Sequence, residues 1–195
     1  MGRLIYTAIC SVDGYVEDAS GEFGWGAPDE EVGQFINGLE RAARTHLLGR
    51  RMYETLLFWE TAPAEGNEPD AGLAFGALWR ASNKVVFSRT LQSASSQRTT
   101  IERSFDRDAV RQLKESERDE LTIGGAELAG LALRLGLVDE VRLFLAPVTV
   151  GGGKPALPKD LSISLSLRDE RRFEAGTLYL RYDVDATHAS AARAP

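Results

Sequence analysis

The sequence is poor in the residues that build disulfides, metal centres and hydrolytic sites. Its 195 residues include one cysteine, Cys10, and two histidines. A single cysteine excludes an internal disulfide framework and is typical of a reducing compartment. His46 and His188 lie far apart, so no zinc-binding spacing exists, and His46 at the head of an apolar strand does not support a Ser-His-Asp triad. We expect no metal, and we assign any catalysis to an organic cofactor.

Long apolar runs and clusters of positive charge are also missing. No apolar run reaches the length of a membrane span, and the first residues are interpreted as a strand, with no signal peptide before it. The net charge is −6 and the basic residues are scattered, which argues against nucleic acid or an anionic membrane as the main partner. We therefore expect a cytoplasmic protein with one domain over residues 1–185 and a disordered tail over residues 186–195.

What the chain does contain is an alternation of strand-like and helical patterns. Residues 4–10 predict a buried strand, and residues 29 to about 44 predict an amphipathic helix. Further strands are predicted over residues 45–48, 84–87, 99–102 and 140–148, and a hairpin over residues 161–167 and 177–184 with its turn at 168–176. This order predicts an α/β fold with a mainly parallel central sheet, helices on both faces and an antiparallel C-terminal hairpin.

Two strand-to-helix junctions contain glycine. Residues 121–128 run from an apolar strand through Gly124 and Gly125 into a helical pattern that Gly136 ends. A second junction places Arg50 and Arg51 directly after Gly49. One such junction alone is more typical of a tight turn, but two of them favour a ligand with phosphate groups, because glycine allows close backbone approach and helix N-termini favour anions.

Arginines follow the ends of several predicted strands. Arg50, Arg51 and Arg89 each come just after the carboxyl end of a strand, where open α/β sheets bind ligands. Each of them taken alone is also compatible with an ordinary solvated cation. Taken together they match phosphate geometry, and the pair Ser88-Arg89 suits a 2′-phosphate, which favours NADP over NAD.

Acidic and aromatic residues near the first long helix suggest a substrate site. Asp29, Glu30 and Glu31 open the helix, where their default role is to interact with the helix dipole. Glu31 lies four residues before Phe35 and shortly after Trp25, so it could pair with the N–H groups of a flat heterocycle or help to deliver a proton. The run Gly151-Gly152-Gly153-Lys154 is interpreted as a strand-terminating turn, because it departs from the phosphate-loop pattern.

The chain resembles the dihydrofolate reductase-like superfamily, and in particular bacterial dihydrofolate reductase family proteins related to the reductase domain of riboflavin biosynthesis. The segments that carry the resemblance are residues 6–16, 49–54, 85–89, 123–128, 136–141 and 146–155. It implies a single-domain dihydrofolate reductase-like fold that binds NADPH, and a homodimer, since relatives are often dimers. The loop over residues 18–28 lacks the Trp-Asn-Leu-Pro run of the folate enzymes, which weakens folate as the substrate.

The resemblance also implies roles for individual residues. It assigns the nicotinamide to Ala8, Asp13, Gly14 and Val16. It assigns the phosphates and the adenosine end to Gly49, Arg50, Arg51, Met52, Ser88 and Arg89, and the pyrophosphate to Ile123, Gly124, Gly125, Ala126, Glu127 and Leu128. Glu31 and Phe35 reproduce the spacing of the acid and the aromatic residue that bind the pterin in dihydrofolate reductases.

These features lead to one functional hypothesis and two alternatives. The hypothesis is an NADPH-dependent reductase that transfers a hydride to a C=N or C=O group of a small planar polar substrate, such as a pterin or pyrimidine derivative. Glu31 would be catalytic, and Trp25, Phe35, Phe58 and Trp59 would wall the substrate pocket. The first alternative is a non-catalytic NADP(H)-binding or sensor protein, and the second is a structural interaction module.

Overall fold

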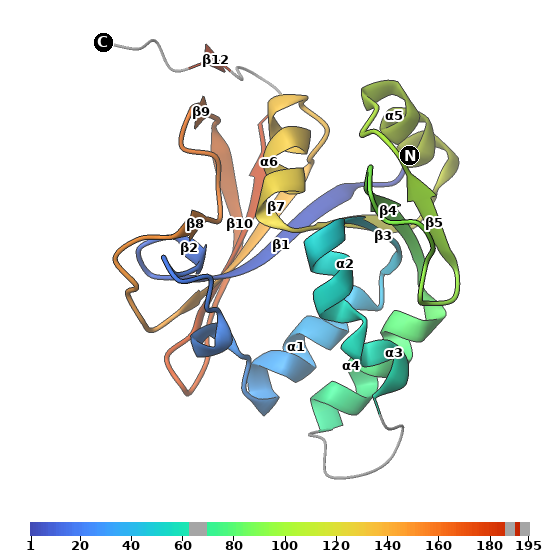
Figure 1. The fold of residues 1–195 in the computed structure, drawn as a ribbon. Coiled ribbons are helices and arrows are strands. Elements are labelled where there is room, and N and C mark those ends of the chain that lie inside the picture. The colour runs from blue at the N-terminus through green and yellow to red at the C-terminus, as the bar shows by residue number, and fades with distance from the viewer. Residues whose placement is uncertain (63–69, 186–189, 192–195) are drawn as a thin grey trace. The chain divides into compact units, whose positions relative to one another are not determined.

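The computed structural model describes residues 1–62, 70–185 and 190–191 (Figure 1). Its contacts divide the chain into two units. Unit 1 comprises residues 1–3 and 28–125, and unit 2 comprises residues 4–27 and 126–195. Strands and helices occur in both units, as expected for the α/β class predicted from the sequence. The prediction of a single domain over residues 1–185 stays a prediction.

Unit 1 is built on parallel strands in the order β6-β3-β4-β5. These strands are β3 (Ala43–Gly49), β4 (Asn83–Phe87), β5 (Thr99–Glu102) and β6 (Glu120–Gly124). The helices are α1 (Glu30–Glu40), α2 (Arg50–Leu56), α3 (Phe58–Thr61), α4 (Asp70–Ala81) and α5 (Arg107–Ser116). Parallel strands need crossover connections. Helices α2, α3 and α4 lie between β3 and its neighbour β4, whereas the connection from β4 to its neighbour β5 contains no helix. Helix α5 connects β5 to β6 at the other edge of these strands.

The core of unit 1 joins its strands to α2 and α4. Leu48 of β3 and Val86 of β4 are buried together with Tyr53 of α2 and Trp79 of α4. Their aliphatic and aromatic surfaces leave water together, which is the main stabilising contribution to such a cluster. The first residues of α2 therefore follow directly from a strand that is anchored in the core.

Helix α1 packs closely against α4 because one of its residues has no side chain. A Cβ added at Gly33 would lie 2.8 Å from the Cβ of Ala71 in α4. The side-chain amide of Asn37, one turn further on, donates to the carbonyl of Ala71 at 2.7 Å. Asp29 caps α1 by accepting from the amide of Val32 at 2.8 Å. These contacts fix the helix that carries Glu31.

Unit 2 contains strands in the order β10-β11-β7-β1. They are β1 (Leu4–Ser11), β7 (Glu140–Ala146), β10 (Leu165–Arg172) and β11 (Leu178–Val184). Strand β1 runs beside β7 (Figure 1), and the two pair in parallel. Strand β11 pairs with β7 and β10 pairs with β11, both antiparallel, so that they add a hairpin to β7. Thus the parallel strands and the antiparallel C-terminal strands that the sequence predicts are confirmed.

Short elements complete unit 2. They are β2 (Tyr15–Glu17) paired with β8 (Lys154–Pro155), β9 (Leu161–Ser162) paired with β12 (Ser190–Ala191), the 3-10 helix η1 (Gly24–Gly26) and α6 (Ala126–Arg134). Helix α6 begins directly after Gly125 and ends before Gly136, which has a φ of +65°. This helix was predicted from the spacing of its apolar residues, and its position is confirmed.

The C-terminal hairpin differs from its predicted boundaries. The sequence analysis placed residues 168–176 in the turn, but β10 continues to Arg172 and the tight turn lies between Phe173 and Thr177. The prediction was wrong because it relied on the alternation of apolar and polar residues, which stops at the charged residues 168–172 although the strand continues. An exposed edge strand is commonly charged, and Arg168 reaches Asp183 of the neighbouring strand with a 2.6 Å contact.

Other element ends were also placed wrongly. The helix predicted to about residue 44 ends at Glu40, and β3 begins at Ala43 instead of residue 45. Ala43 pairs with Glu120 of β6, so tertiary pairing overrides the helical propensity of this stretch. Strand β7 ends at Ala146 and does not reach residue 148.

The predicted disordered tail lies outside the described residues, apart from the two residues of β12. Within the described part of the chain, no helix has both the length and the apolar character that a membrane span requires.

Candidate functional site

The glycine and arginine segments of unit 1 lie at one edge of its sheet. β3 ends at Gly49, β4 at Phe87 and β6 at Gly124. Gly49 pairs with Phe87 in the register of β3 and β4, and Leu48 pairs with Gly124 in that of β3 and β6. Because these strands are parallel, the residues that follow them emerge side by side, at the position where α/β sheets bind ligands.

The two glycines of the β6 junction make room for α2. A Cβ at Gly124 would lie 2.8 Å from Cδ2 of Leu48 and 3.2 Å from Cγ of Met52. Gly125 has a φ of +94°, in the left-handed region that favours glycine, and its added Cβ would lie 3.4 Å from the Cβ of Met52. Close packing at this edge therefore requires small residues there, whether or not a ligand is bound.

The arginines at this edge have different surroundings. Arg50 donates from Nε to Glu54 at 2.7 Å and from Nη1 to the hydroxyl of Thr90 at 2.8 Å. It therefore links the start of α2 to the segment after β4. Arg51 and Arg89 are exposed, and each follows the end of a strand at the same edge as the glycines.

The acidic residues at the start of α1 have different contacts. Asp29 is the helix cap, and Glu30 accepts from the side chain of Gln34 at 2.8 Å and from the amide of Ala71 at 3.0 Å. Glu31 follows them on the helix and is partly buried. The catalytic role of Glu31 stays a prediction, but two of the three neighbouring acids have structural roles.

The predicted substrate-site aromatics belong to both units. Phe58 is 53% exposed and meets Trp59 edge-on with ring centroids 5.0 Å apart. Trp59 also packs on Phe75 of α4 at 5.3 Å, so it contributes to the packing of unit 1. Trp25 lies in η1 of unit 2, where its indole N–H donates to the carbonyl of Glu22 at 3.1 Å. Their common pocket stays a prediction.

His46 is nearly buried in β3, as the sequence analysis expected. Its Nδ1 lies 2.5 Å from the hydroxyl of Thr122, and its side chain is 12% exposed. Burial, with a smaller contribution from the charge of Lys84, lowers the pKa of His46 to about 4. Glu40, 3.8 Å away, favours the charged ring, but burial outweighs it. The imidazole is therefore neutral near pH 7.

In unit 2, the turn between β1 and β2 is tied to the glycine run after β7. The carboxylate of Asp13 accepts from the amides of Val150 at 3.1 Å and Gly151 at 2.7 Å. The Ser11 hydroxyl, followed by these two amides, holds the pKa of Asp13 below its usual range. The glycine run is thus a turn, as the sequence analysis interpreted it, and Asp13 has a structural role there.

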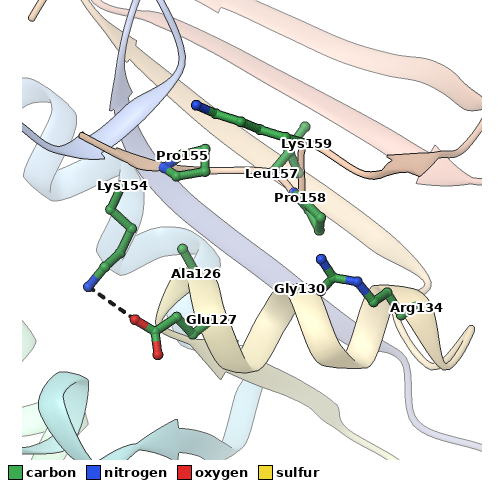
Figure 2. Close-up of a pocket in the computed structure, with 9 residues that line it drawn as sticks. All are labelled: Ala126, Glu127, Gly130, Arg134, Lys154, Pro155, Leu157, Pro158 and Lys159. Carbon is green, nitrogen blue, oxygen red and sulfur yellow. Dashed lines mark ion pairs between the residues drawn. The ribbon is translucent and has the colours of Figure 1, made fainter. Parts of the chain in front are cut away.

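A pocket of about 460 Å³ lies beside α6 in unit 2 (Figure 2). Figure 2 shows Ala126, Gly130 and Arg134 along one side of the helix, facing the segment over residues 154–159. Lys154 pairs with Glu127 at 3.5 Å and also with Glu17 of β2 at 3.0 Å. Since acids pair with this lysine, the pocket carries less positive charge than its lysines suggest.

The family of the chain follows from comparison with known proteins. A protein-family model of the RibD C-terminal domain matches residues 3–179. The chain belongs to the RibD C-terminal domain family. It is also 30% identical over 183 residues to the uncharacterized protein YyaP of Bacillus subtilis (strain 168), a match that covers 92% of this chain and 94% of YyaP. The resemblance drawn from the sequence is therefore confirmed.

Solved structures share the fold of this RibD C-terminal domain protein. A proposed riboflavin biosynthesis protein of Shewanella sp. PV-4 has a TM-score of 0.74 at 18% identity, with 94% of this chain and 99% of that chain covered. A pyrimidine reductase-like protein of Corynebacterium diphtheriae has a TM-score of 0.63 at 17% identity, with 94% and 92% covered. RibD of Acinetobacter baumannii has a TM-score of 0.67 at 16% identity, and the match covers 95% of this chain but 58% of RibD.

The predicted cofactor-binding residues of this RibD C-terminal domain protein fall into two sets. Unit 1 brings together Gly49, Arg50, Arg51, Met52, Ser88, Arg89, Ile123, Gly124 and Gly125 at its strand ends. Unit 2 carries Ala8 in β1, Asp13 and Gly14 in the following turn, Val16 in β2, and Ala126, Glu127 and Leu128 in the first turn of α6. The unit 1 set combines exposed arginines with glycines at one strand edge, and arginine side chains are suited to bind anions.

Two cations at these places were absent from the predicted set. Arg103 follows β5 and donates to the carbonyl of Ser88, and Lys154 lines the pocket beside α6. Lys154 follows the glycine run in sequence, but the run was interpreted only as a turn. No local pattern marks Arg103, because the contact joins residues 15 positions apart in an irregular segment.

Proposed function

We propose that this protein is an NADPH-dependent reductase that transfers a hydride to a C=N or C=O group of a small planar polar substrate, with pyrimidine- and pterin-like compounds as candidates. The observation that supports it best is the edge of unit 1 where β3, β4 and β6 end. Glycines and exposed arginines meet there, in a chain whose net charge is −6. Membership of the RibD C-terminal domain family, together with the likeness in fold to a pyrimidine reductase-like protein, supports the same class of reaction.

In this proposal the protein binds and orients the cofactor. The bound nicotinamide supplies the hydride. Arg51 and Arg89 neutralise phosphate charge, and the glycines at positions 124 and 125 keep side chains away from the backbone amides. The nicotinamide end is assigned, as the resemblance implies, to Ala8 and the turn that contains Asp13.

Glu31 is the proposed source of the proton, either directly or through an ordered water. A carboxyl group on a rigid helix can hold a proton at a defined position beside a substrate nitrogen or oxygen. Asp29 and Glu30 have structural roles, since their carboxylates accept hydrogen bonds from the backbone amides of Val32 and Ala71.

The direct test is NADPH oxidation, followed by absorbance, against a panel of aminopyrimidine, dihydropterin and simple carbonyl compounds. Turnover on a pyrimidine or pterin with NADPH, and much less with NADH, is the expected result. Binding of NADPH without turnover on any compound would favour the alternative of a non-catalytic sensor. Absence of NADPH binding would overturn both and leave the structural interaction module.

We further propose that the protein acts in the cytoplasm as a homodimer that pairs through its C-terminal strands. The exposed strand β10 is consistent with this, because an unpaired strand edge is a ready surface for a second copy. Light scattering at micromolar concentration should give the mass of a dimer, and a monomer mass would contradict the pairing. Cell fractionation should recover the protein with cytoplasmic markers.

A further inference from the structure

The segment after β4 forms a closed turn over residues 88–91. Ser88 is 8% exposed, and its hydroxyl oxygen accepts from the amide of Thr90 at 3.3 Å and from that of Leu91 at 3.0 Å. The backbone amide of Ser88 donates to the carbonyl of Glu102 at 2.9 Å. The turn therefore has one fixed end, while Arg89 and Thr90 are exposed at its tip.

Arg103 holds both ends of this turn. It follows β5, and its Nη1 donates to the carbonyl of Ser88 at 3.1 Å and to that of Leu91 at 2.6 Å. Arg50 reaches the tip of the same turn through its bond to the Thr90 hydroxyl at 2.8 Å. The guanidinium groups of Arg50 and Arg103 therefore contact a turn of four residues that itself contains Arg89.

Positive charges held at one turn repel each other, and a bound anion would reduce this repulsion. Glu54 compensates Arg50 at 2.7 Å, whereas the partners of Arg103 in the turn are neutral carbonyls. A phosphate monoester carries close to two negative charges near neutral pH, and several guanidinium groups around one site favour it strongly. Because the turn is already ordered before the ligand binds, binding through Arg89 does not carry the entropy cost of ordering the backbone of the turn.

We propose that Arg103 is a positioning residue that determines specificity for a phosphate monoester on a nucleoside: it fixes the turn over residues 88–91, in which Ser88 and Arg89 receive the 2′-phosphate. This inference rests on the proposed function and adds a residue outside the segments that carry the family resemblance. Arg103 acts through the turn, so its loss should affect the 2′-phosphate and spare the rest of the nucleotide.

The test uses two small probes, adenosine 2′,5′-bisphosphate and adenosine 5′-monophosphate, and compares their dissociation constants by titration calorimetry. The wild-type protein should bind the bisphosphate about tenfold more tightly or better. Arg103→Gln should bring the ratio of the two constants close to one, with the monophosphate constant almost unchanged. Arg107→Gln is the matched control, since it removes an exposed arginine at the start of α5 and should keep the wild-type ratio.

The outcomes separate this inference from the proposed function. A wild-type protein that does not discriminate between the probes contradicts the NADPH specificity of the proposed function and the role of Arg103 together. A wild-type protein that discriminates, with Arg103→Gln discriminating equally, overturns the role of Arg103 alone. If Arg103→Gln does not fold in thermal unfolding, Arg103→Lys decides: a shorter side chain with a single nitrogen should lower the ratio about threefold, and an unchanged ratio overturns the inference.

Discussion

The strand-end edge of unit 1 and the turns of unit 2 satisfy their polar groups in different ways. In unit 1, Arg51 and Arg89 are exposed and follow the ends of β3 and β4. In unit 2, the carboxylate of Asp13 accepts hydrogen bonds from the amides of residues 150 and 151, and Lys154 forms ion pairs with two acids. Polar groups that are already satisfied stabilise a fold, whereas exposed, gathered charges remain available for a ligand. Because of this difference, unit 1 is the better candidate for an anion-binding site.

A glycine substitution in unit 2 should produce the largest effect. Gly153 has a φ of +132°, and an added Cβ would lie 2.0 Å from the carbonyl oxygen of Glu17. Since that oxygen belongs to the backbone, Gly153→Ala should cost several kcal/mol of unfolding free energy, on the order of 3 or more. Gly151 has a φ of +75° with open space around it, so Gly151→Ala should cost only about 1 kcal/mol. Urea unfolding measures both, and equal losses would contradict the close approach.

Mild acid should lower the free energy of unfolding, because His46 is buried in unit 1 and its pKa is lowered there. The pKa of His46 is about 4 in the folded protein, below its ordinary value of 6.5, so the unfolded chain takes up a proton first as the pH falls. The stabilisation is complete above pH 6.5 and is lost as the pH falls toward 4, by about 3 kcal/mol in total. Urea unfolding between pH 7 and pH 4 should show this loss, and His46→Gln should flatten it.

Asp13→Asn is the matched control from unit 2. The pKa of Asp13 is lowered from 3.8, so its stabilisation is present above that pH and disappears only as the pH falls below it. The variant should therefore leave the loss between pH 6.5 and 4.5 unchanged. An equal flattening by both variants would mean that the acid response does not originate in the buried histidine.

Glu31→Gln should lower turnover about 100-fold, because a general acid typically contributes at least that factor. The affinity for NADPH should stay nearly constant, since the substitution removes a proton donor and no phosphate contact. Steady-state kinetics and NADPH titration on the same preparation separate these effects. Glu30→Gln should instead weaken the contact with Ala71 and lower stability, with turnover of the folded protein preserved. Unchanged turnover in Glu31→Gln would remove it from the catalytic role.

The smallest effect concerns the exposed arginine of unit 1. Arg89→Ala should weaken NADPH binding about tenfold and leave NADH binding nearly unchanged, because only NADPH carries the 2′-phosphate. Fluorescence titration with both cofactors measures the ratio. Equal weakening of NADPH and NADH binding would mean that Arg89 does not recognise the 2′-phosphate. The exposed arginines of unit 1 would then not mark a specific anion site.

Local sequence signals were sufficient for much of the fold. The apolar spacing predicted α6, the positive-φ glycine at 136 ended it, and Asp29 capped α1. The ends of β3, β4 and β6 were placed well enough to bring residues 49–52, 88–89 and 123–125 to one edge. These features depend on neighbours within a few residues, and such signals are present in the sequence itself.

The tertiary structure alone decided the features that join distant residues. Ala43 entered β3 because it pairs with Glu120, Asp13 found its partners 137 and 138 positions away, and Arg103 fastened the turn after β4. The local sequence does not reveal the partner in such contacts. The residues around an arginine can be the same whether its side chain is solvated or donates to a distant backbone carbonyl. The sequence alone determined the family, the order of elements and the residues at the strand ends. Which polar groups are already satisfied, and which remain for a ligand, depended on long-range contacts.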